Sequence, residues 1–587
     1  MPSLIFVQKK KRPGETSAFD PTGDAGSVRI VVRIEPGATI LDAARQAKID
    51  IETPCNAIGS CGKCKVQIPN PKERNHIKKC GVHLLSEDEI AQGIVLACQT
   101  AVYEDEDITV LVKDYEDENK HLRILSEGGS FEYGKRPFIT KEFQGHKTVV
   151  YGNGVPIGTE DGDTTDAVYG LAVDIGTTTM VAGLIDLKNG QTLMSDSALN
   201  PQSAYAQDVL SRIHFAGKGD GLAILYRAFI ETLRTMIAKL TRTTGINGAH
   251  IYEAVYSGNT AMLHLACHVD PSSLGKYPYT PKITGGCEVA AEALGIAPFG
   301  VIYLPPVISA YVGADITSGI LSSRLADKKG VTVFIDIGTN GEMVLAKDGV
   351  LAASSTAAGP AFEGMNISCG MRASLGALES FSIEDDGSVS YQVISDITGG
   401  DNAGSESDFV SGICGSGLLD LAGELVRCGV IDKSGRFVPP EKGAYPDTLK
   451  ARMRKLEGKN TFFITDTVYL SQKDIRQIQL AKGAMRCGIE MLLTHFSLRP
   501  VDVDAVVIAG SFGYHLNEAS LINIGLLPAA FAGKVHFAGN TSLSGGIALL
   551  MNTAFRDEMK ELVTQVDHVE LSRDAQFEGL FIKYMEL

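Results

Sequence analysis

The chain has 587 residues, of which 44% are hydrophobic and 21% charged, so it is long enough for several domains with buried cores. Its formal net charge of −16 argues against a general nucleic-acid binder, because phosphate binding requires a basic surface. The sequence has no apolar run of the ~20 residues that cross a bilayer. Its start, MPSLIFVQKKKR, places apolar residues before basic ones, the reverse of a signal peptide. We therefore expect a cytoplasmic protein with neither nucleic acid nor membrane as a partner.

The first elements along the chain predict a small α+β domain over residues 28–113. Alternating residues predict strands, and a Ser or Thr with an acidic residue three positions later is typical of a helix start. The predicted elements are a strand at 28–34, a helix capped by Thr39 with Asp42, a second helix capped by Ser86 with Glu89, and a strand at 108–114.

A cysteine loop with the pattern C-x5-C-x2-C separates the two predicted helices, and a fourth cysteine follows in the stretch ACQT. Gly59 and Gly62 permit the tight turns that bring loop thiolates around one centre. The plant-type [2Fe–2S] spacing is C-x4-C-x2-C with a remote fourth cysteine. The first gap here is one residue longer, which resembles adrenodoxin-like ferredoxins. The predicted cluster ligands are Cys55, Cys61, Cys64 and Cys98.

Two alternatives bear on this site. A structural zinc site usually has two C-x2–4-C knuckles, which the gap of five residues fits poorly. Cys80, in IKKCGVH, is a competing candidate for the fourth ligand, although LACQT better matches the way a ferredoxin domain returns to its cluster. Only eleven cysteines occur in the chain, too few for a disulfide framework, so clustered cysteines indicate metal or redox chemistry.

Residues 114–166 lack clear periodicity and include EGGS, YGNG and EDGDTTD. We interpret them as a linker or a small middle domain. The acidic stretch at 103–118 is read as a solvated edge, with a docking surface for a basic partner as the alternative.

The remainder, residues 167–587, contains an internal repeat. YGLAVDIGTTTMVAGLIDL begins at Tyr169 and VTVFIDIGTNGEMVLAKDG at Val331, so an apolar strand runs into Asp-Ile-Gly-Thr twice. Asp174 and Asp336 end these strands, where a carboxylate can hold Mg²⁺. Glycine lets the backbone approach phosphate oxygens, and hydroxyl or amide groups can donate to them. The predicted phosphate-binding residues are Gly176, Thr177, Thr178, Thr179, Gly338, Thr339, Asn340 and Gly341.

A third glycine loop follows the apolar strand AVVIAG near the C-terminus. Its residues Gly510, Ser511 and Gly513 resemble the adenosine-binding loop of the actin, Hsp70 and sugar-kinase superfamily, whose two phosphate loops match the DIGT segments. This resemblance implies ATP as cofactor and a two-lobed actin-like ATPase domain. The fold class is therefore α/β multidomain, with an N-terminal α+β [2Fe–2S] ferredoxin-like (β-grasp) domain.

The combination of both domains resembles the reductive activators of corrinoid proteins, through the cysteines, both phosphate loops, AAGPAFEG, QDVLSRI and the adenosine-type loop. The resemblance implies ATP-dependent transfer of one electron to a Co(II) corrinoid protein, giving Co(I). It implies an upstream electron donor, which the sequence does not identify, and a homodimer as one possible assembly.

Three alternatives come from other functional classes: a small-molecule kinase with a redox-sensing cluster, a nucleotide-switched redox scaffold, and an activator of radical dehydratases. The last group holds its cluster with cysteines of the ATPase domain, where this chain has scattered cysteines and no tight pair. The fused cluster domain disfavours the first two.

Overall fold

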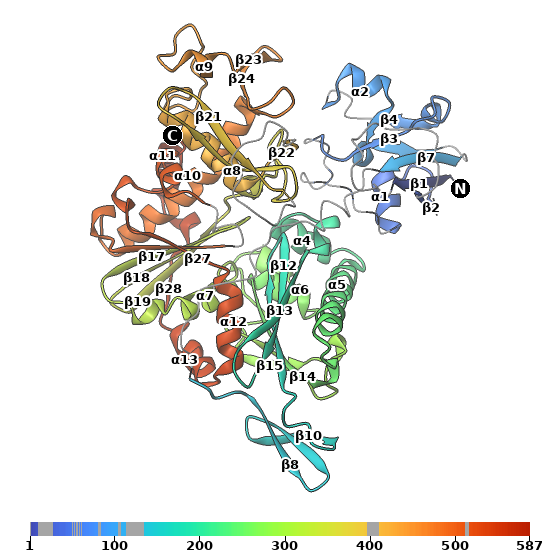
Figure 1. Ribbon diagram of the computed structural model, residues 1–587, viewed down its shortest axis with the longest axis vertical. Coiled ribbons are helices and arrows are strands. Elements are labelled where there is room, and N and C mark those ends of the chain that lie inside the picture. The colour runs from blue at the N-terminus through green and yellow to red at the C-terminus, as the bar shows by residue number, and fades with distance from the viewer. Residues whose placement is uncertain are drawn as a thin grey trace. The chain divides into compact units, whose positions relative to one another are not determined.

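The computed structural model of the chain describes residues 2–9, 27–47, 49, 51, 53, 57, 59, 62–79, 84–103, 107–112, 134–395, 410–510 and 516–587. These residues fall into two compact units, which are described separately (Figure 1). The first unit comprises residues up to 122 together with 201–212, and the second comprises 123–200 and 213–587. Within the described ranges, no helix has the length and apolar character needed to span a membrane.

The first unit is built on a five-stranded sheet. In spatial order its strands are β2 (Ser27–Arg33), β1 (Ser3–Lys9), β7 (Asp107–Val112), β3 (Lys65–Gln67) and β5 (Ile94–Leu96). Helix α1 (Ile40–Gln46) packs its apolar side into the core of this sheet, and α2 (Glu87–Ala91) lies near β5. Both helices begin with the predicted capping boxes, at Thr39 and Ser86. Strands β4 (Ile77–Lys79) and β6 (Thr100–Val102) form a separate pair.

Strand β1 was not expected from the sequence. It pairs with β2 in antiparallel and with β7 in parallel orientation, so it lies inside the sheet. Leu4 and Phe6 are fully buried, while the alternating positions Ser3 and Ile5 are not. The predicted domain start at residue 28 leaves this strand out, because an apolar run of four residues separated from the next strand carries little local signal.

The second unit contains two lobes, each with a six-stranded sheet. In the first lobe the spatial order is β13 (Thr192–Leu199), β12 (Thr179–Asp186), β11 (Tyr169–Ile175), β14 (Ile251–Gly258), β16 (Val301–Leu304) and β15 (Cys287–Ala290). In the second it is β27 (Val535–Gly539), β26 (Ala505–Ala509), β17 (Val331–Ile337), β18 (Gly341–Lys347), β19 (Val350–Thr356) and β28 (Asp567–His568).

The two lobes repeat one arrangement. Each DIGT segment ends the first strand of an antiparallel hairpin, and that strand also pairs with a parallel neighbour, β14 in the first lobe and β26 in the second. The hairpins therefore place corresponding loops at the carboxyl ends of corresponding strands.

Helices α7 (Ala314–Ser322) and α12 (Thr541–Met551) lie between the two sheets (Figure 1). They pack closely because small residues face each other: a Cβ on Gly545 would lie 2.1 Å from the Ser318 carbonyl oxygen. Ile316 and Leu549 share one buried core with residues of both sheets. Movement of either lobe must therefore involve this helix pair, since packed interiors transmit displacement.

Further helices cover the outer faces of the two lobes. They are α5 (Gly221–Thr244) and α6 (Thr260–Ala266) in the first lobe, and α8 (Gly415–Arg427), α10 (Gln472–His495), α11 (Glu518–Asn523) and α14 (Phe577–Tyr584) in the second. The second lobe also carries the small sheets β20 (Ala377–Ile383), β21 (Val389–Val393), β22 (Gly412–Ile413) and β23 (Met453–Leu456), β24 (Lys459–Phe463), β25 (Tyr469–Ser471).

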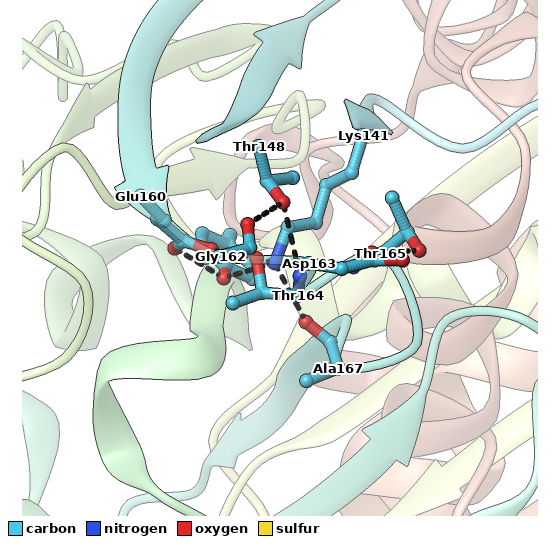
Figure 2. Close-up of polar contacts among 9 residues, drawn as sticks. Lys141, Thr148, Glu160, Gly162, Asp163, Thr164, Thr165 and Ala167 are labelled. Atoms are coloured by element: carbon cyan, nitrogen blue, oxygen red, sulfur yellow. Dashed lines mark hydrogen bonds and ion pairs between the residues drawn. The ribbon is translucent and has the colours of Figure 1, made fainter. Parts of the chain in front are cut away.

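The described part of the stretch interpreted as a linker or small domain is folded. Strands β8 (Ile139–Gln144), β9 (Lys147–Gly152) and β10 (Val155–Asp161) form an antiparallel sheet. Figure 2 shows the buried Lys141 ammonium among polar residues of this small sheet and of the segment that follows it. The Nζ atom of Lys141 lies 2.8 Å from Glu160 Oε2. Nζ also donates to the hydroxyl of Tyr252 in β14 at 2.7 Å, and burial lowers the pKa of Lys141. This network fixes the small sheet to the first lobe.

Candidate functional site

The first of two candidate sites lies in the first unit and is the pair of cysteines that the structure describes. Cys64 immediately precedes β3, and Cys98 lies in a 3-10 turn immediately after β5. Because β3 and β5 pair with Lys65 opposite Leu96, and the Ala97 amide donates to the Cys64 carbonyl at 2.8 Å, the two cysteines meet. Their sulfurs are 3.2 Å apart and buried. Strand register thus brings the remote cysteine to the loop, as a shared iron centre requires.

The loop before Cys64 has the backbone that the glycines predicted. Gly59 and Gly62 have φ of +82° and +70°, the left-handed region that favours glycine. A Cβ on Gly59 would lie 2.4 Å from Cδ of Gln99, next to Cys98. Cys55, Cys61 and the competing candidate Cys80 lie outside the described residues.

A separate candidate site lies in the second unit and is formed by the two DIGT hairpins, whose loops meet. The hydroxyl oxygens of Thr178 in the first loop and Thr339 in the second are 3.2 Å apart. Both hydroxyls donate to the carboxylate of Glu363, Thr339 to Oε1 at 2.6 Å and Thr178 to Oε2. The structure therefore brings together residues that are 161 positions apart in the sequence, as expected for loops that clasp one polyphosphate.

The two predicted aspartates have different surroundings. Asp174 accepts hydrogen bonds from Asn540 Nδ2 and Ser542 Oγ, each at 2.8 Å. Asn540 is the N-cap of α12, where its side chain also accepts from the Leu543 amide. Asp336 has no hydrogen-bond donor among the described residues, and its neighbours are other carboxylates.

Asp315 and Glu342 join Asp174 and Asp336 in a group of four carboxylates. Burial, followed by the charges of Asp315 and Asp174, raises the pKa of Asp336 to about 8. Burial and the Asp174 charge raise the pKa of Asp315 to about 7. The pKa of Glu342 is raised well above its ordinary value by burial and then by Asp315 and Asp336. Burial also raises the pKa of Asp174, opposed by the Ser542 and Asn540 hydrogen bonds. Such a group is stabilised by a cation.

The carboxylates do not by themselves form a complete metal site. Across the described ranges, no three His, Cys, Asp or Glu side chains converge as a ready set of ligands. Mg²⁺ is commonly bound through one or two carboxylates, waters and substrate phosphates, so the donor set fits a cation that arrives with a nucleotide.

The loop glycines also differ. A Cβ on Gly176 would lie 2.7 Å from the Thr179 carbonyl oxygen, so the first loop itself requires glycine. Among the described residues, a Cβ on Gly338 would meet only the Asn340 carbonyl oxygen at 3.5 Å, an ordinary contact. Within that part of the chain, the first loop is therefore tightly packed at its glycine and the second is not.

The predicted third loop begins beside the second hairpin. Gly510 follows β26 with φ of +120°, and a Cβ there would lie 2.7 Å from the Ile337 carbonyl oxygen and 3.3 Å from Asp336 Oδ1. Gly510 thus lies against the DIGT loop, while Ser511 and Gly513 lie outside the described residues. Thr177 is buried beside Thr178, Thr179 begins β12, Asn340 hydrogen-bonds Glu342, and Gly341 begins β18 against Met485.

Several functional residues were missed in the sequence. Asp315 follows Gly313, whose Cβ would lie 2.6 Å from the Gly258 carbonyl oxygen and which is therefore fixed against another loop. Glu363 is the second-to-last residue of the stretch AAGPAFEG, which was used for the family resemblance without a role for its glutamate. Asn540 and Ser542 follow an apolar strand in the pattern of a helix start, a signal that predicts a cap but not its contact with Asp174.

Comparison with known proteins gives a matching division of the chain. Three family models match in succession: "2Fe-2S iron-sulfur cluster binding domain" over residues 24–103, "RACo middle region" over 169–328, and "C-terminal domain of RACo the ASKHA domain" over 330–587. The predicted fold class, a ferredoxin-like domain followed by an actin-like ATPase, is confirmed. The family's middle region corresponds to the first lobe.

Similar proteins span nearly the whole chain. A solved structure titled "Reductive activator for corrinoid,iron-sulfur protein" is 30% identical, covers 100% of this chain and 98% of its own, and has a TM-score of 0.69. The "Corrinoid activation enzyme RamQ" of Eubacterium limosum is 28% identical over 93% of this chain and 95% of its own length. The "[Co(II) methylated amine-specific corrinoid protein] reductase" of Methanosarcina barkeri is 23% identical over 71% and 76%.

Proposed function

Since this chain belongs to the family of reductive activators of corrinoid proteins, we propose that it couples ATP hydrolysis to one-electron reduction of a partner's Co(II) cobamide to Co(I). One observation supports this above the others: a single chain carries both a cysteine pair in a ferredoxin-like unit and an ATPase unit whose two phosphate loops meet. A kinase or a chaperone-like ATPase has no need of the cysteine pair.

The cluster site is assigned to Cys55, Cys61, Cys64 and Cys98. When bound, a [2Fe–2S] cluster supplies a one-electron carrier, whose potential in plant-type proteins is about −400 mV. The buried sulfurs of Cys64 and Cys98, 3.2 Å apart, suit two ligands of one iron. Cys64→Ala should abolish bound iron and the visible spectrum, and Cys80→Ala should keep both. Loss of iron in Cys80→Ala would show that Cys80 is a ligand and that the assigned set is wrong.

The nucleotide site is assigned to the two DIGT loops and the loop after β26. Thr178 and Thr339 would donate to phosphate oxygens, and the backbone at Gly338 would approach the phosphates. Asp336 would hold Mg²⁺, which would compensate the charge of the carboxylates and of the phosphates. Closure of the lobes on ATP would displace α7 and α12, which pack against both sheets. The ATPase unit would thereby change its affinity for the partner.

The energies involved are of comparable size. Moving one electron uphill by 100 mV costs about 2.3 kcal/mol. Coupling free energies between two binding sites are ordinarily about 1–3 kcal/mol. Nucleotide-dependent partner binding can therefore drive a modestly uphill transfer without contact between ATP and the electron carrier.

The test uses the whole protein with its cluster reduced and a Co(II) corrinoid protein. ATP should be required for loss of the Co(II) absorption signal, and phosphate release should be slow alone and accelerate when the Co(II) partner is added. The Co(I) or methylated partner should stimulate less, because a protein that drives a conversion must release its product. Reduction to the same extent without ATP would overturn the proposal.

The kinase alternative is also testable on a structural feature. A cavity of about 610 Å³ lies beside the second phosphate loop, since its lining residue Thr356 pairs with Gly341. Tyr279, Tyr311 and Phe577 also line it. Transfer of the γ-phosphate to a metabolite, detected with radiolabelled ATP, would favour a kinase.

A further inference from the structure

We propose that Glu363 is the residue that orients, and accepts a proton from, the water that attacks the γ-phosphorus of ATP. This inference rests on the proposed function only in assuming that the chain hydrolyses ATP. Glu363 contacts the hydroxyl of one threonine from each phosphate loop, and those hydroxyls are 3.2 Å apart. Its carboxylate therefore stands where the two loops meet, at the position that a terminal phosphate would reach.

The hydrogen bonds indicate how the carboxylate becomes available. Thr178 and Thr339 each have one hydroxyl hydrogen, and in the structure both are directed to Glu363. When phosphate oxygens arrive, the same hydroxyls can donate to them instead. Glu363 then loses its two protein donors and can accept a hydrogen bond from a water that faces the phosphate. Threonine hydroxyls thus hold the base in the nucleotide-free protein and the phosphate in the complex.

The backbone under Glu363 is held in place from behind. The short turn Pro360–Glu363 is bounded by Gly359 and Gly364, with φ of +79° and +76°, and its Phe362 is fully buried. A Cβ on Gly415, at the start of α8, would lie 1.8 Å from the Phe362 carbonyl oxygen. Such close backbone contacts leave the turn little freedom, and a general base must be positioned in this way.

Glu363 also differs in kind from the four grouped carboxylates. Asp174, Asp315, Asp336 and Glu342 repel one another and suit a cation. The contacts of the Glu363 carboxylate in the described residues are neutral hydroxyl donors. A carboxylate left outside the cation's ligand set keeps its lone pairs for a water molecule.

Hydrolysis replaces one bond of the γ-phosphorus with another. The water oxygen forms a bond to the γ-phosphorus while the bond from that phosphorus to the β,γ-bridging oxygen breaks. One water proton passes to the Glu363 carboxylate, and ADP leaves with the electron pair of the broken bond. The proton then passes from Glu363 to the released phosphate, which restores the carboxylate.

The experiment measures steady-state phosphate release and, separately, binding of a non-hydrolysable Mg·ATP analogue by calorimetry. Glu363→Gln preserves shape and one acceptor but removes the base, and positioned bases contribute about 10²–10⁴-fold. We expect kcat to fall at least about 100-fold while the analogue's Kd stays within a few fold of wild type. Glu384→Gln, in an exposed turn of the same lobe, is the matched control.

A second variant separates a missing base from a damaged site. In Glu363→Ala, added formate should restore part of the hydrolysis, because it can occupy the vacated space as a carboxylate. Unchanged kcat in Glu363→Gln, with tighter binding of the analogue, would show that Glu363 is only a latch between the loops and would overturn the proposal. Wild-type protein that hydrolyses ATP without reducing Co(II) would overturn the proposed function and leave this test intact.

Discussion

The two DIGT loops have the same four-residue motif but are built in opposite ways. In the first, the protein satisfies its own groups: Asn540 and Ser542 donate to Asp174, and a Cβ on Gly176 would lie 2.7 Å from the Thr179 carbonyl oxygen. In the second, within the described residues, the charged groups around Asp336 are other carboxylates, and a Cβ on Gly338 would make only one ordinary contact.

Because of this difference, the aspartates of the two loops have different requirements before a ligand binds. A carboxylate that accepts two neutral hydrogen bonds is fixed in place before the ligand binds, whereas a carboxylate that faces other carboxylates needs a cation. We infer that the first loop is a rigid half of the site and that the second loop binds the cation and the phosphates. Repeated sequence therefore does not imply repeated function, because the surroundings of each copy come from other parts of the chain.

The largest expected effect is loss of Mg·ATP hydrolysis on neutralising the second loop. Asp336→Asn removes a carboxylate that has no protein donor, and we expect kcat/KM to fall by at least about 100-fold with a higher Mg²⁺ requirement. Asp174→Asn should lower the rate with a smaller change in Mg²⁺ requirement. Both variants should keep their iron. Equal Mg²⁺ titration curves for the two variants would contradict the division of tasks.

Alanine substitutions of the two loop glycines should affect different quantities, nucleotide binding for Gly338 and unfolding free energy for Gly176. Gly338→Ala introduces a Cβ where a ligand would lie, so Kd for Mg·ATP should rise by about tenfold or more at unchanged stability. Gly176→Ala introduces a clash with the Thr179 carbonyl oxygen and should cost about 1–3 kcal/mol of unfolding free energy. Calorimetry and urea unfolding measure the two quantities. A folding defect in Gly338→Ala with normal binding would refute the assignment of that space to the ligand.

Removal of one of the two side chains that donate to Asp174 should have a moderate effect on ATPase activity. Asn540→Ala deletes a hydrogen bond to the Asp174 carboxyl group and the cap of α12, so ATPase activity should fall by about tenfold, equivalent to about 1.4 kcal/mol. Asn552→Ala, at the other end of the same helix, is the matched control. Similar activities of the two variants would mean that Asp174 does not depend on its donor.

The smallest expected effect is on thermal stability as a function of pH. A carboxyl with a pKa of about 8 when folded, as for Asp336, and near 4 when unfolded is destabilising once ionised. This loss of stability is absent below pH ~4, near the pKa of the unfolded state, and grows until the pH exceeds the pKa of the folded state. Without nucleotide, Tm should therefore fall by a few degrees between pH 5 and 8.

Asp336→Asn should flatten that fall, and the exposed Asp385→Asn should not. Mg²⁺ with ADP should also flatten it in the wild type by compensating the charges. A wild-type Tm that falls no more steeply over this range than the Tm of Asp336→Asn would contradict the pKa assignment.

Local pattern alone determined much of this protein. The capping boxes at Thr39 and Ser86, the strand preceding each DIGT loop, and the turns at Gly59 and Gly62 follow from the sequence because each depends on neighbours within a few residues. The family resemblance came from the same short motifs, spaced along nearly the whole chain.

Tertiary structure alone decided which groups meet across the site. Strand β1 joins the sheet through pairing with β7, about a hundred residues later, and Asn540 reaches Asp174 across 366 positions. Glu363 lies against Thr178 only because two lobes close on each other. Such contacts arise from packing between distant segments, for which the local sequence carries no periodic signal, and they determine which carboxylate is neutralised by protein donors and which requires a cation.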